Sequence, residues 1–295
     1  MSFRWEGLEG GDAFPLRGGS APIALEADGV RHPASPRRSA GILTRYRDIT
    51  HVALSARALW LGTRASVYVL PHGLFREHGA PERLARALRE RIAALPDGAA
   101  RIAALARLDR LVEHPAQPRA TWALIALCAC VYALELALGA RVLLAGHFSP
   151  ALVADGDAWR ILTANLLHAQ GGAAGYAHIA LNLIALWVLG PLVERPLGSA
   201  RTACAMGAAA VGAMLTAGAF GNTTVVGASG IAFGLVGSEL WLDHRRADKL
   251  PAVWRFPRRG LWLVVAINVV IGVLLPFIAL AAHLGGLVAG ALATA

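Results

Sequence analysis

Four residues in the carboxy-terminal half of the chain could carry out acyl-transfer chemistry. Ser229 lies in the stretch "GASG" at the start of an apolar run, and His283 lies in a later apolar run. His178 and Asn182 are four residues apart in "HIALN", so they share one face of a helix. A serine beside a histidine base is a candidate nucleophile. Free backbone N–H groups at a helix start, with side-chain donors beside them, can stabilise the oxyanion that such a serine creates.

These residues belong to a part of the chain that is predicted to lie in a membrane. Residues 1–118 carry 17 of the 28 basic and 12 of the 19 acidic residues, whereas residues 120–295 are apolar apart from short charged clusters. The run over 122–139 would be about 27 Å long, close to the ~30 Å thickness of a bilayer core. Several of the other runs are short, and their alanines and glycines favour close helix packing. We predict an α-helical polytopic membrane protein with six spans, near 122–139, 177–193, 203–220, 225–242, 260–276 and 279–295.

The basic residues between these runs predict the orientation of the chain. The loop after the fourth run holds six basic residues, whereas the loops after the third and fifth runs hold none. By the positive-inside rule, that loop and the amino terminus are cytoplasmic. The second, fourth and sixth runs then all begin at the outer face, which places the serine, the asparagine and the two histidines at similar depth.

Glycine spacing is expected to bring two of these helix starts together. Gly230 and Gly234 are four residues apart, as are Gly286 and Gly290, and such small-residue pairs let helices approach closely. The serine hydroxyl would then come within reach of the histidine of the last run. A lone histidine or serine in a span is more often a hydrogen-bonding partner between helices. Four polar groups at one depth favour a site instead, because polar residues are costly in a membrane.

Residues 1–112 are predicted to form a small soluble α+β domain, followed by a linker over 113–119 and the six-span domain over 120–295. Much of residues 1–40 is expected to be irregular, with one strand at "PIALEA". Alternating residues over 42–71 predict antiparallel strands, and helices are predicted from Pro81 and over 98–113. Strands closed by a helix resemble a pleckstrin-homology-like domain. We favour a cytosolic accessory or dimerisation module over specific lipid binding.

Composition argues against several other classes of function. The net charge is +9, but the arginines are scattered without an aromatic-interleaved basic run, which argues against nucleic-acid binding. Cys128, Cys130 and Cys204 lie in apolar runs and suggest neither a metal site nor a disulfide framework. The histidines of the first domain lack metal-ligand spacing, so no metal and no cofactor are expected. The first thirty residues lack an apolar run, and no signal peptide is expected.

Three motifs resemble those of the rhomboid family of intramembrane serine proteases. They are "GASG" with Ser229, "HIALN" with His178 and Asn182, and "AHLGGLVAG" with His283. The resemblance covers residues 120–295. It implies a catalytic dyad of Ser229 and His283 without an aspartate, and an oxyanion hole made by His178, Asn182 and the backbone N–H of Ser229.

Further residues extend the resemblance. Trp159 and Arg160 resemble the tryptophan–arginine pair of the family's first outer loop, and "GPLVERPLGSAR", with Glu194, resembles the turn after its second span. Phe233 stands where the family places an aromatic ring against the catalytic histidine. The supporting glycines are Gly227, Gly230 and Gly286.

The connection before the second span departs from the family pattern. His168 resembles the family's loop histidine, but it precedes His178 by ten residues where about five are usual. That difference leaves the orientation of His168 open. Two carboxylates receive smaller roles: Glu135 is expected to be interfacial, and Glu239 to pair with nearby arginines.

The leading interpretation is an intramembrane serine endopeptidase in a prokaryotic cell membrane, with its amino terminus cytoplasmic. Its expected partners are the lipid bilayer and single-span membrane protein substrates, cut near the outer boundary beside small residues. The fifth span is expected to move as a lateral gate around Pro276. One alternative is a catalytically silent rhomboid-like protein that binds membrane clients, although such relatives lack the serine or the histidine. A transporter with broken helices ranks lower, because no internal repeat is apparent.

Overall fold

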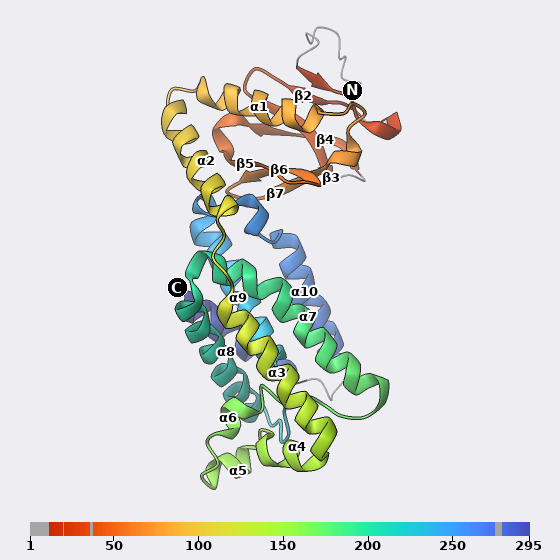
Figure 1. Cartoon of the computed structure of the whole chain (residues 1–295), viewed down its shortest axis with the longest axis vertical. Helices are drawn as coiled ribbons and strands as arrows, with labels where there is room; N and C mark the ends of the chain where they lie inside the picture. Colours follow the sequence, from red (N-terminus) through yellow and green to blue (C-terminus); the bar gives the residue numbers. More distant parts are fainter. Residues whose placement is uncertain (1–11, 20, 36–37, 275–278) are drawn as a thin grey trace. The chain divides into compact units, whose positions relative to one another are not determined.

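The computed structural model describes residues 12–19, 21–35, 38–274 and 279–295. The chain forms two compact units. The amino-terminal unit comprises Met1–His114 together with Arg246–Pro257, and the membrane unit comprises Pro115–Arg245 and Arg258–Ala295 (Figure 1). The short segment 246–257, which the sequence suggested was a loop of the six-span part, therefore packs with the amino-terminal unit.

Two antiparallel sheets build the amino-terminal unit. The first holds β1 (Ala13–Phe14), β2 (Ile23–Leu25), β3 (Gly29–Ser35) and β4 (Arg38–Arg45), and the second holds β5 (Ile49–Leu54), β6 (Ala58–Thr63) and β7 (Val67–Pro71). The strand expected at "PIALEA" is confirmed as β2, and β4 overlaps the start of the strands predicted over 42–71, but the expectation that much of residues 1–40 is irregular is wrong for β3. His32 explains the error, because this polar residue occupies an inward position of β3, where its Nε2 lies 2.8 Å from Thr44 Oγ1.

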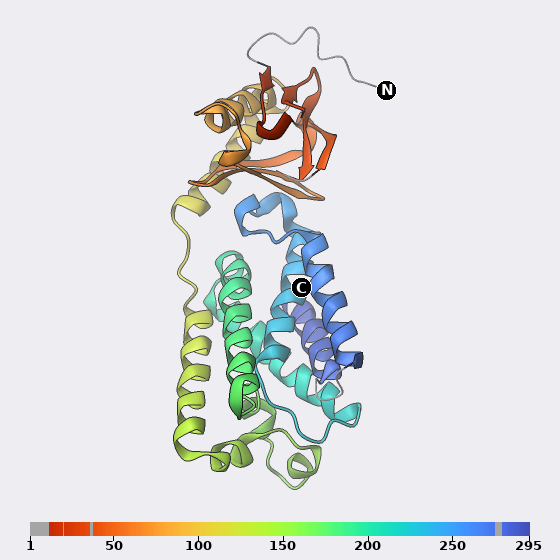
Figure 2. The same ribbon diagram turned by 90° about the vertical axis from the view of Figure 1, so that its right-hand side faces the viewer.

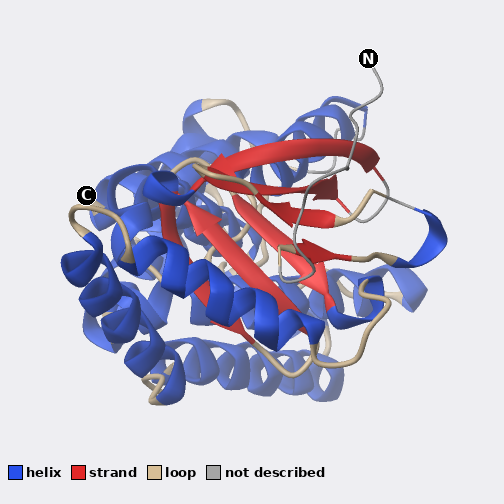
Figure 3. Ribbon diagram, turned by 90° about the horizontal axis from the view of Figure 1, so that it is seen from above, coloured by secondary structure: helices blue, strands red, loops and turns tan. Residues whose placement is uncertain are grey.

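Helices α1 (Ala80–Ala93) and α2 (Gly98–Glu113) pack against β5 and complete this unit (Figure 3). Leu84, Leu88 and Ile92 of α1 are four residues apart, share one face of the helix and are fully buried in its core. The structure thus confirms a small unit of strands and helices at the amino terminus. The pleckstrin-homology-like resemblance stays a prediction.

Six longer helices form the core of the membrane unit. They are α3 (Arg119–Leu138), α7 (Gly172–Leu197), α8 (Ser199–Ala219), α9 (Ser229–Arg246), α10 (Arg258–Leu274) and α11 (Leu280–Thr294) (Figure 2). Within the described residues, four stretches are long and apolar enough to cross a membrane: 119–138, 172–197, 199–219 and 252–274. Helix α11 is apolar but shorter. Six crossings stay a prediction, and Pro276, the expected gate position, lies outside the described residues.

The loop after α3 contains three short helices that the sequence analysis did not identify. These are α4 (Ala140–Gly146), α5 (Pro150–Ala154) and α6 (Arg160–Thr163). At the other end of α3, the buried carboxylate of Glu194 on α7 accepts hydrogen bonds from the backbone N–H groups of Ala120 and Thr121, at 2.7 and 2.8 Å. A carboxylate at a helix start satisfies donors that the helix itself leaves free. Glu194 therefore joins α3 to α7.

The buried His51 of β5 predicts that the amino-terminal unit loses stability in mild acid. Burial lowers the pKa of His51 from 6.5 to about 4; Asp109 raises it, and Arg89 and Arg255 lower it further. Because the unfolded chain binds this proton near pH 6.5 and the folded chain only near pH 4, the stabilisation is fully present above pH 6.5. It is lost as the pH falls toward 4. Between pH 7 and pH 5, the free energy of unfolding should fall by about 2 kcal/mol.

Pulse proteolysis of the whole chain in urea, read from cuts within residues 49–71, measures this loss. His51→Asn is the control, because its amide keeps an acceptor but does not titrate in this range. The same pH dependence in both proteins would show that His51 is not responsible.

Candidate active site

Helices α9 and α11 touch through their glycines. Gly286 of α11 faces Gly230 of α9, and Gly290 faces Gly234 one turn further along. A Cβ atom added at Gly286 or Gly290 would collide with the backbone of the opposite helix. The two backbones are therefore in direct contact, as small-residue pairs allow.

This contact brings a serine and a histidine together. Ser229 is the first residue of α9, and its Oγ lies 2.9 Å from Nε2 of His283, in the first turn of α11. The His283 ring stacks on Phe233 with centroids 4.5 Å apart and an interplanar angle of 2°. Among the described residues, no group hydrogen-bonds to the buried Nδ1 of His283. The aromatic stack, rather than a carboxylate, therefore fixes the plane of this ring.

His178 of α7 lies against the loop that precedes the serine. A Cβ atom at Gly227 would be 2.8 Å from His178 Nε2. Gly227 also has a backbone φ of 121°, which residues other than glycine rarely adopt. The N–H of Ala169 donates to His178 Nδ1 at 3.1 Å, so the neutral ring carries its proton on Nε2. Nε2–H therefore faces the Gly227 backbone.

Asn182 lies one turn beyond His178 and is buried. Its Nδ2 donates to the backbone carbonyl of His178 at 2.7 Å. A side-chain amide has two N–H donors, so one N–H of Asn182 remains for another acceptor.

Glu135 of α3 lies inside the protein, beside the connection that precedes α7. It is only 1% exposed, and both carboxylate oxygens lie 3.2 Å from the backbone N–H of His168. Gln170 adds a hydrogen bond from its Nε2 to the Glu135 carbonyl at 3.1 Å. Its interfacial depth stays a prediction, but its contacts are internal: Glu135 holds the lengthened connection whose Ala169 N–H donates to His178. The only signal in the sequence was a carboxylate within an apolar run.

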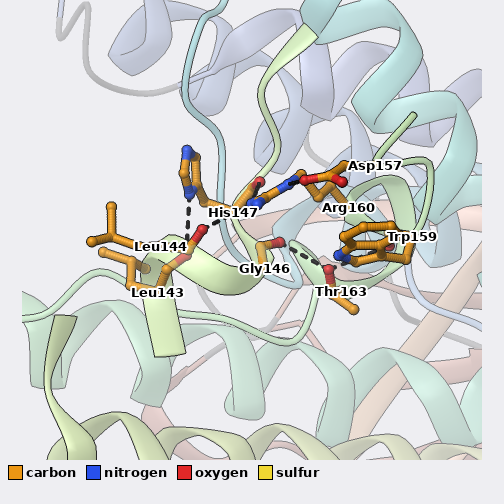
Figure 4. Close-up of polar contacts among 8 residues, drawn as sticks. All are labelled: Leu143, Leu144, Gly146, His147, Asp157, Trp159, Arg160 and Thr163. Carbon is orange, nitrogen blue, oxygen red and sulfur yellow. Dashed lines mark hydrogen bonds and ion pairs between the residues drawn. The ribbon is translucent and has the colours of Figure 1, made fainter. Parts of the chain in front are cut away.

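The loop of α4 to α6 is folded around Arg160 (Figure 4). This buried guanidinium donates to the carbonyls of Leu144 and His147, at 2.9 and 3.2 Å, and to the Asp157 carboxylate at 2.8 Å. Its neighbour Trp159 is 54% exposed. The two residues of the tryptophan–arginine pair therefore differ: the arginine holds the loop together through hydrogen bonds, and the tryptophan is exposed.

The same loop supports the backbone ahead of the serine. Phe148 and Val225 exchange two backbone hydrogen bonds, at 3.0 and 3.2 Å, and the Gly227 N–H donates to the Ala164 carbonyl at 2.9 Å. Residues 225–227 are thus tied to two points of the loop immediately before Ser229.

Glu239 of α9 is fully buried, and its pairing with nearby arginines stays a prediction. Among the described residues, no group of three His, Cys, Asp or Glu side chains is arranged to hold a metal ion.

A family model described as Rhomboid domain matches residues 155–295, which include Ser229, His283 and His178. This match covers just under half of the chain and supports a rhomboid-family protein. The Rhomboid domain match and the four long apolar stretches together support a multi-pass membrane protein. The rhomboid match begins within the loop of α4 to α6, so α3 and the amino-terminal unit precede it.

Several curated rhomboid proteins are similar to this chain. Rhomboid protease GluP of Bacillus subtilis (strain 168) is 34% identical over 146 residues, which are 49% of this chain and 27% of that protein. Rhomboid protease GlpG of Klebsiella pneumoniae (strain 342) is 29% identical over 188 residues, 61% of this chain and 63% of that protein. RHOMBOID-like protein 6, mitochondrial, of Arabidopsis thaliana is 31% identical over 146 residues, 47% and 43% of the two chains. The chain thus spans less than two thirds of each relative's length.

The glycine contact predicts that Gly286→Ala separates α9 from α11, because the new methyl group meets the backbone of Gly230. Overpacking of this kind costs about 1–3 kcal/mol, and thermal unfolding of the chain in detergent measures it. Gly207→Ala on α8 is the matched control, since a Cβ there meets nothing within 4 Å. Equal unfolding temperatures for the two variants would contradict the contact.

Proposed function

We propose that this rhomboid protein is an intramembrane serine endopeptidase in which Ser229 is the nucleophile and His283 is the base. The observation that carries the proposal is the 2.9 Å distance between Ser229 Oγ and His283 Nε2. The rhomboid proteases of Bacillus subtilis and Klebsiella pneumoniae support the class of reaction, because their names describe proteases.

In the acylation step, Ser229 Oγ attacks the carbonyl carbon of the scissile peptide bond and its proton moves to His283 Nε2. The carbonyl oxygen becomes an oxyanion, and the C–N bond then breaks as His283 returns the proton to the leaving amine. In the second step, water attacks the acyl-serine and gives its proton to His283. Release of the new carboxylate restores the Ser229 hydroxyl.

The oxyanion accepts hydrogen bonds from the backbone N–H of Ser229, from His178 Nε2–H and from the remaining N–H of Asn182. The assignment for His178 is supported by the Ala169 N–H on Nδ1, which leaves the proton on Nε2. The assignment for Ser229 is supported by its place as the first residue of α9, where the backbone N–H has no partner within its own helix.

We further propose six membrane crossings, a cytoplasmic amino terminus and a bacterial cell membrane as the location. The basic loop after α9 supports this orientation through the positive-inside rule. Substrates are single-span membrane proteins that are cut near the outer boundary of the membrane. Small residues beside the cut let the substrate helix unwind locally, so that the peptide bond can enter the site.

Removal of either member of the dyad is expected to abolish cleavage. Ser229→Ala removes the attacking oxygen and His283→Ala removes the base, so both should cut a single-span reporter at background level. Ser238→Ala on the same helix should cut at close to the native rate, because Ser238 Oγ bonds to Gly234 and Gly290 and not to His283. A folded native chain that binds but never cuts the reporter would favour the client-binding alternative.

Glu135 is expected to act on catalysis through His178. Glu135→Ala frees the 168–170 segment and with it the orientation of His178, so kcat should fall by about tenfold with little change in KM. Glu135→Gln keeps an acceptor oxygen and should recover most of the rate. Cleavage kinetics in detergent measure both variants, and equal losses of kcat and thermal stability in both would indicate a purely structural role.

A further inference from the structure

Residues 246–257, which we call the α9–α10 segment, are built into the amino-terminal unit. The segment contains two short turns, η4 (Ala247–Lys249) and η5 (Ala252–Trp254), that pack against β5 and β6. Ala247, Ala252, Trp254 and Arg255 are buried, although they belong to a loop with six basic residues in the sequence. This segment is therefore part of a folded core rather than a solvated connection.

Directed hydrogen bonds hold the segment in place. The Ala252 N–H donates to His51 Nδ1 of β5 at 2.8 Å. The Arg255 guanidinium donates to the backbone carbonyls of Thr63 and Arg64 at 2.6 and 3.3 Å. Because Arg255 is only 3% exposed, loss of these bonds would leave carbonyl oxygens in a buried site, which is costly.

Asp109 of α2 and Arg89 of α1 lie beside His51, on the side of the ring away from the α9–α10 segment. His51 Nε2 lies 3.4 Å from an oxygen of Asp109 on α2, and Arg89 of α1 donates to both Asp109 oxygens, at 2.9 and 3.1 Å. Arg89 also donates to the Val52 carbonyl at 2.7 Å. Because Nδ1 accepts the hydrogen bond from the Ala252 N–H, the neutral ring carries its proton on Nε2, which lies on the Asp109 side of the ring.

The two ends of the segment lead directly into α9 and α10. Asp243, near the end of α9, forms an ion pair with Arg258 at the start of α10, and Arg258 Nη2 also donates to the Asp243 carbonyl at 2.7 Å. The helices differ in how they are packed. Most of α9 is buried, whereas across its described residues 258–274 α10 buries Leu261 alone. Helix α10 is therefore loosely packed within its own unit, where it contacts α11.

We propose that the amino-terminal unit restrains α10 by holding the α9–α10 segment, and so limits the entry of membrane substrates to the site. The substrate part of this inference rests on the proposed function. Ser229 and His283 meet through the glycine contact of α9 with α11, which does not involve the segment. Release of the segment therefore changes access by a helical substrate and leaves the chemistry of Ser229 unchanged.

The test compares Arg255→Gln with Arg259→Gln in the whole chain in detergent. Arg255→Gln removes the guanidinium that binds Thr63 and Arg64, whereas Arg259 is exposed and belongs to α10 just beyond the segment. We expect Arg255→Gln to raise cleavage of a single-span reporter by about threefold or more, because α10 moves more freely. Labelling of Ser229 by a small fluorophosphonate should stay at the native rate, and Arg259→Gln should resemble the native protein in both assays.

A disulfide between β6 and the α9–α10 segment tests whether release of the segment, rather than another effect of Arg255→Gln, changes the cleavage rate. A Cβ atom at Gly62 would lie 3.1 Å from Ala252 Cβ, so Gly62→Cys with Ala252→Cys needs a shift of a few tenths of an ångström to reach the ~3.5–4.5 Å of a disulfide. The exposed Cys130 and Cys204 are replaced by alanine first. Oxidation of this pair in the Arg255→Gln background should return cleavage to the native rate, and reduction should raise it again.

Two results would overturn the proposal: an Arg255→Gln chain that cleaves like Arg259→Gln, or faster cleavage that persists after the disulfide has formed. Hydrogen exchange of the 258–274 amides tests the restraint without any substrate. Exchange there should be faster in Arg255→Gln and slower once the disulfide has formed. If the native chain cuts no reporter, the proposed function fails, and unchanged exchange would then be the separate result that rejects the restraint.

Discussion

The backbone contact between α9 and α11 is the constraint on which the rest of the membrane unit depends. Gly230 and Gly234 meet Gly286 and Gly290 without side chains between them, so two helix starts lie close enough for a serine hydroxyl to reach an imidazole. Glycine weakens a helix interior by about 1 kcal/mol relative to alanine. Cβ atoms at Gly286 and Gly290 would collide with α9, whereas those at Gly230 and Gly234 would collide with alanines of α8. The glycines therefore indicate close packing of α9 against both helices, which larger residues would prevent.

Around this contact, polar groups are held by partners from several elements. Phe233 orients the ring of His283, and the lengthened connection before α7 supplies the Ala169 N–H that orients His178. Glu135 fixes that connection from α3, and the loop around Arg160 ties down the backbone before Ser229. Buried polar groups without partners are costly, so this arrangement lets an apolar bundle contain a polar site.

Much of the candidate site could be predicted from the sequence, because the patterns that indicate it are local. The glycine spacing, "HIALN" and the serine at a helix start each lie within a few residues, and helical periodicity converts such spacing into a shared face. The helix over 98–113 was predicted to its observed ends for the same reason.

The features that could not be predicted are contacts between residues far apart in the chain. Glu135 meets His168 across 33 positions, and His51 meets Ala252 across 201. No local pattern in the sequence marks such pairs. Polar side chains such as those of Glu135 and His51 are usually expected at an exposed surface. Strand β3 was missed for a related reason, since a buried histidine bonded to Thr44 interrupts the apolar alternation.

The most direct test of the account is covalent labelling of the whole chain with a fluorophosphonate, read by peptide mass spectrometry. The account predicts one adduct, on Ser229, which disappears in Ser229→Ala and forms far more slowly in His283→Ala because the base is gone. Gly286→Ala should also slow it. Labelling at another residue, or an unchanged rate in His283→Ala, would contradict the claim that the contact of α9 with α11 creates the nucleophile.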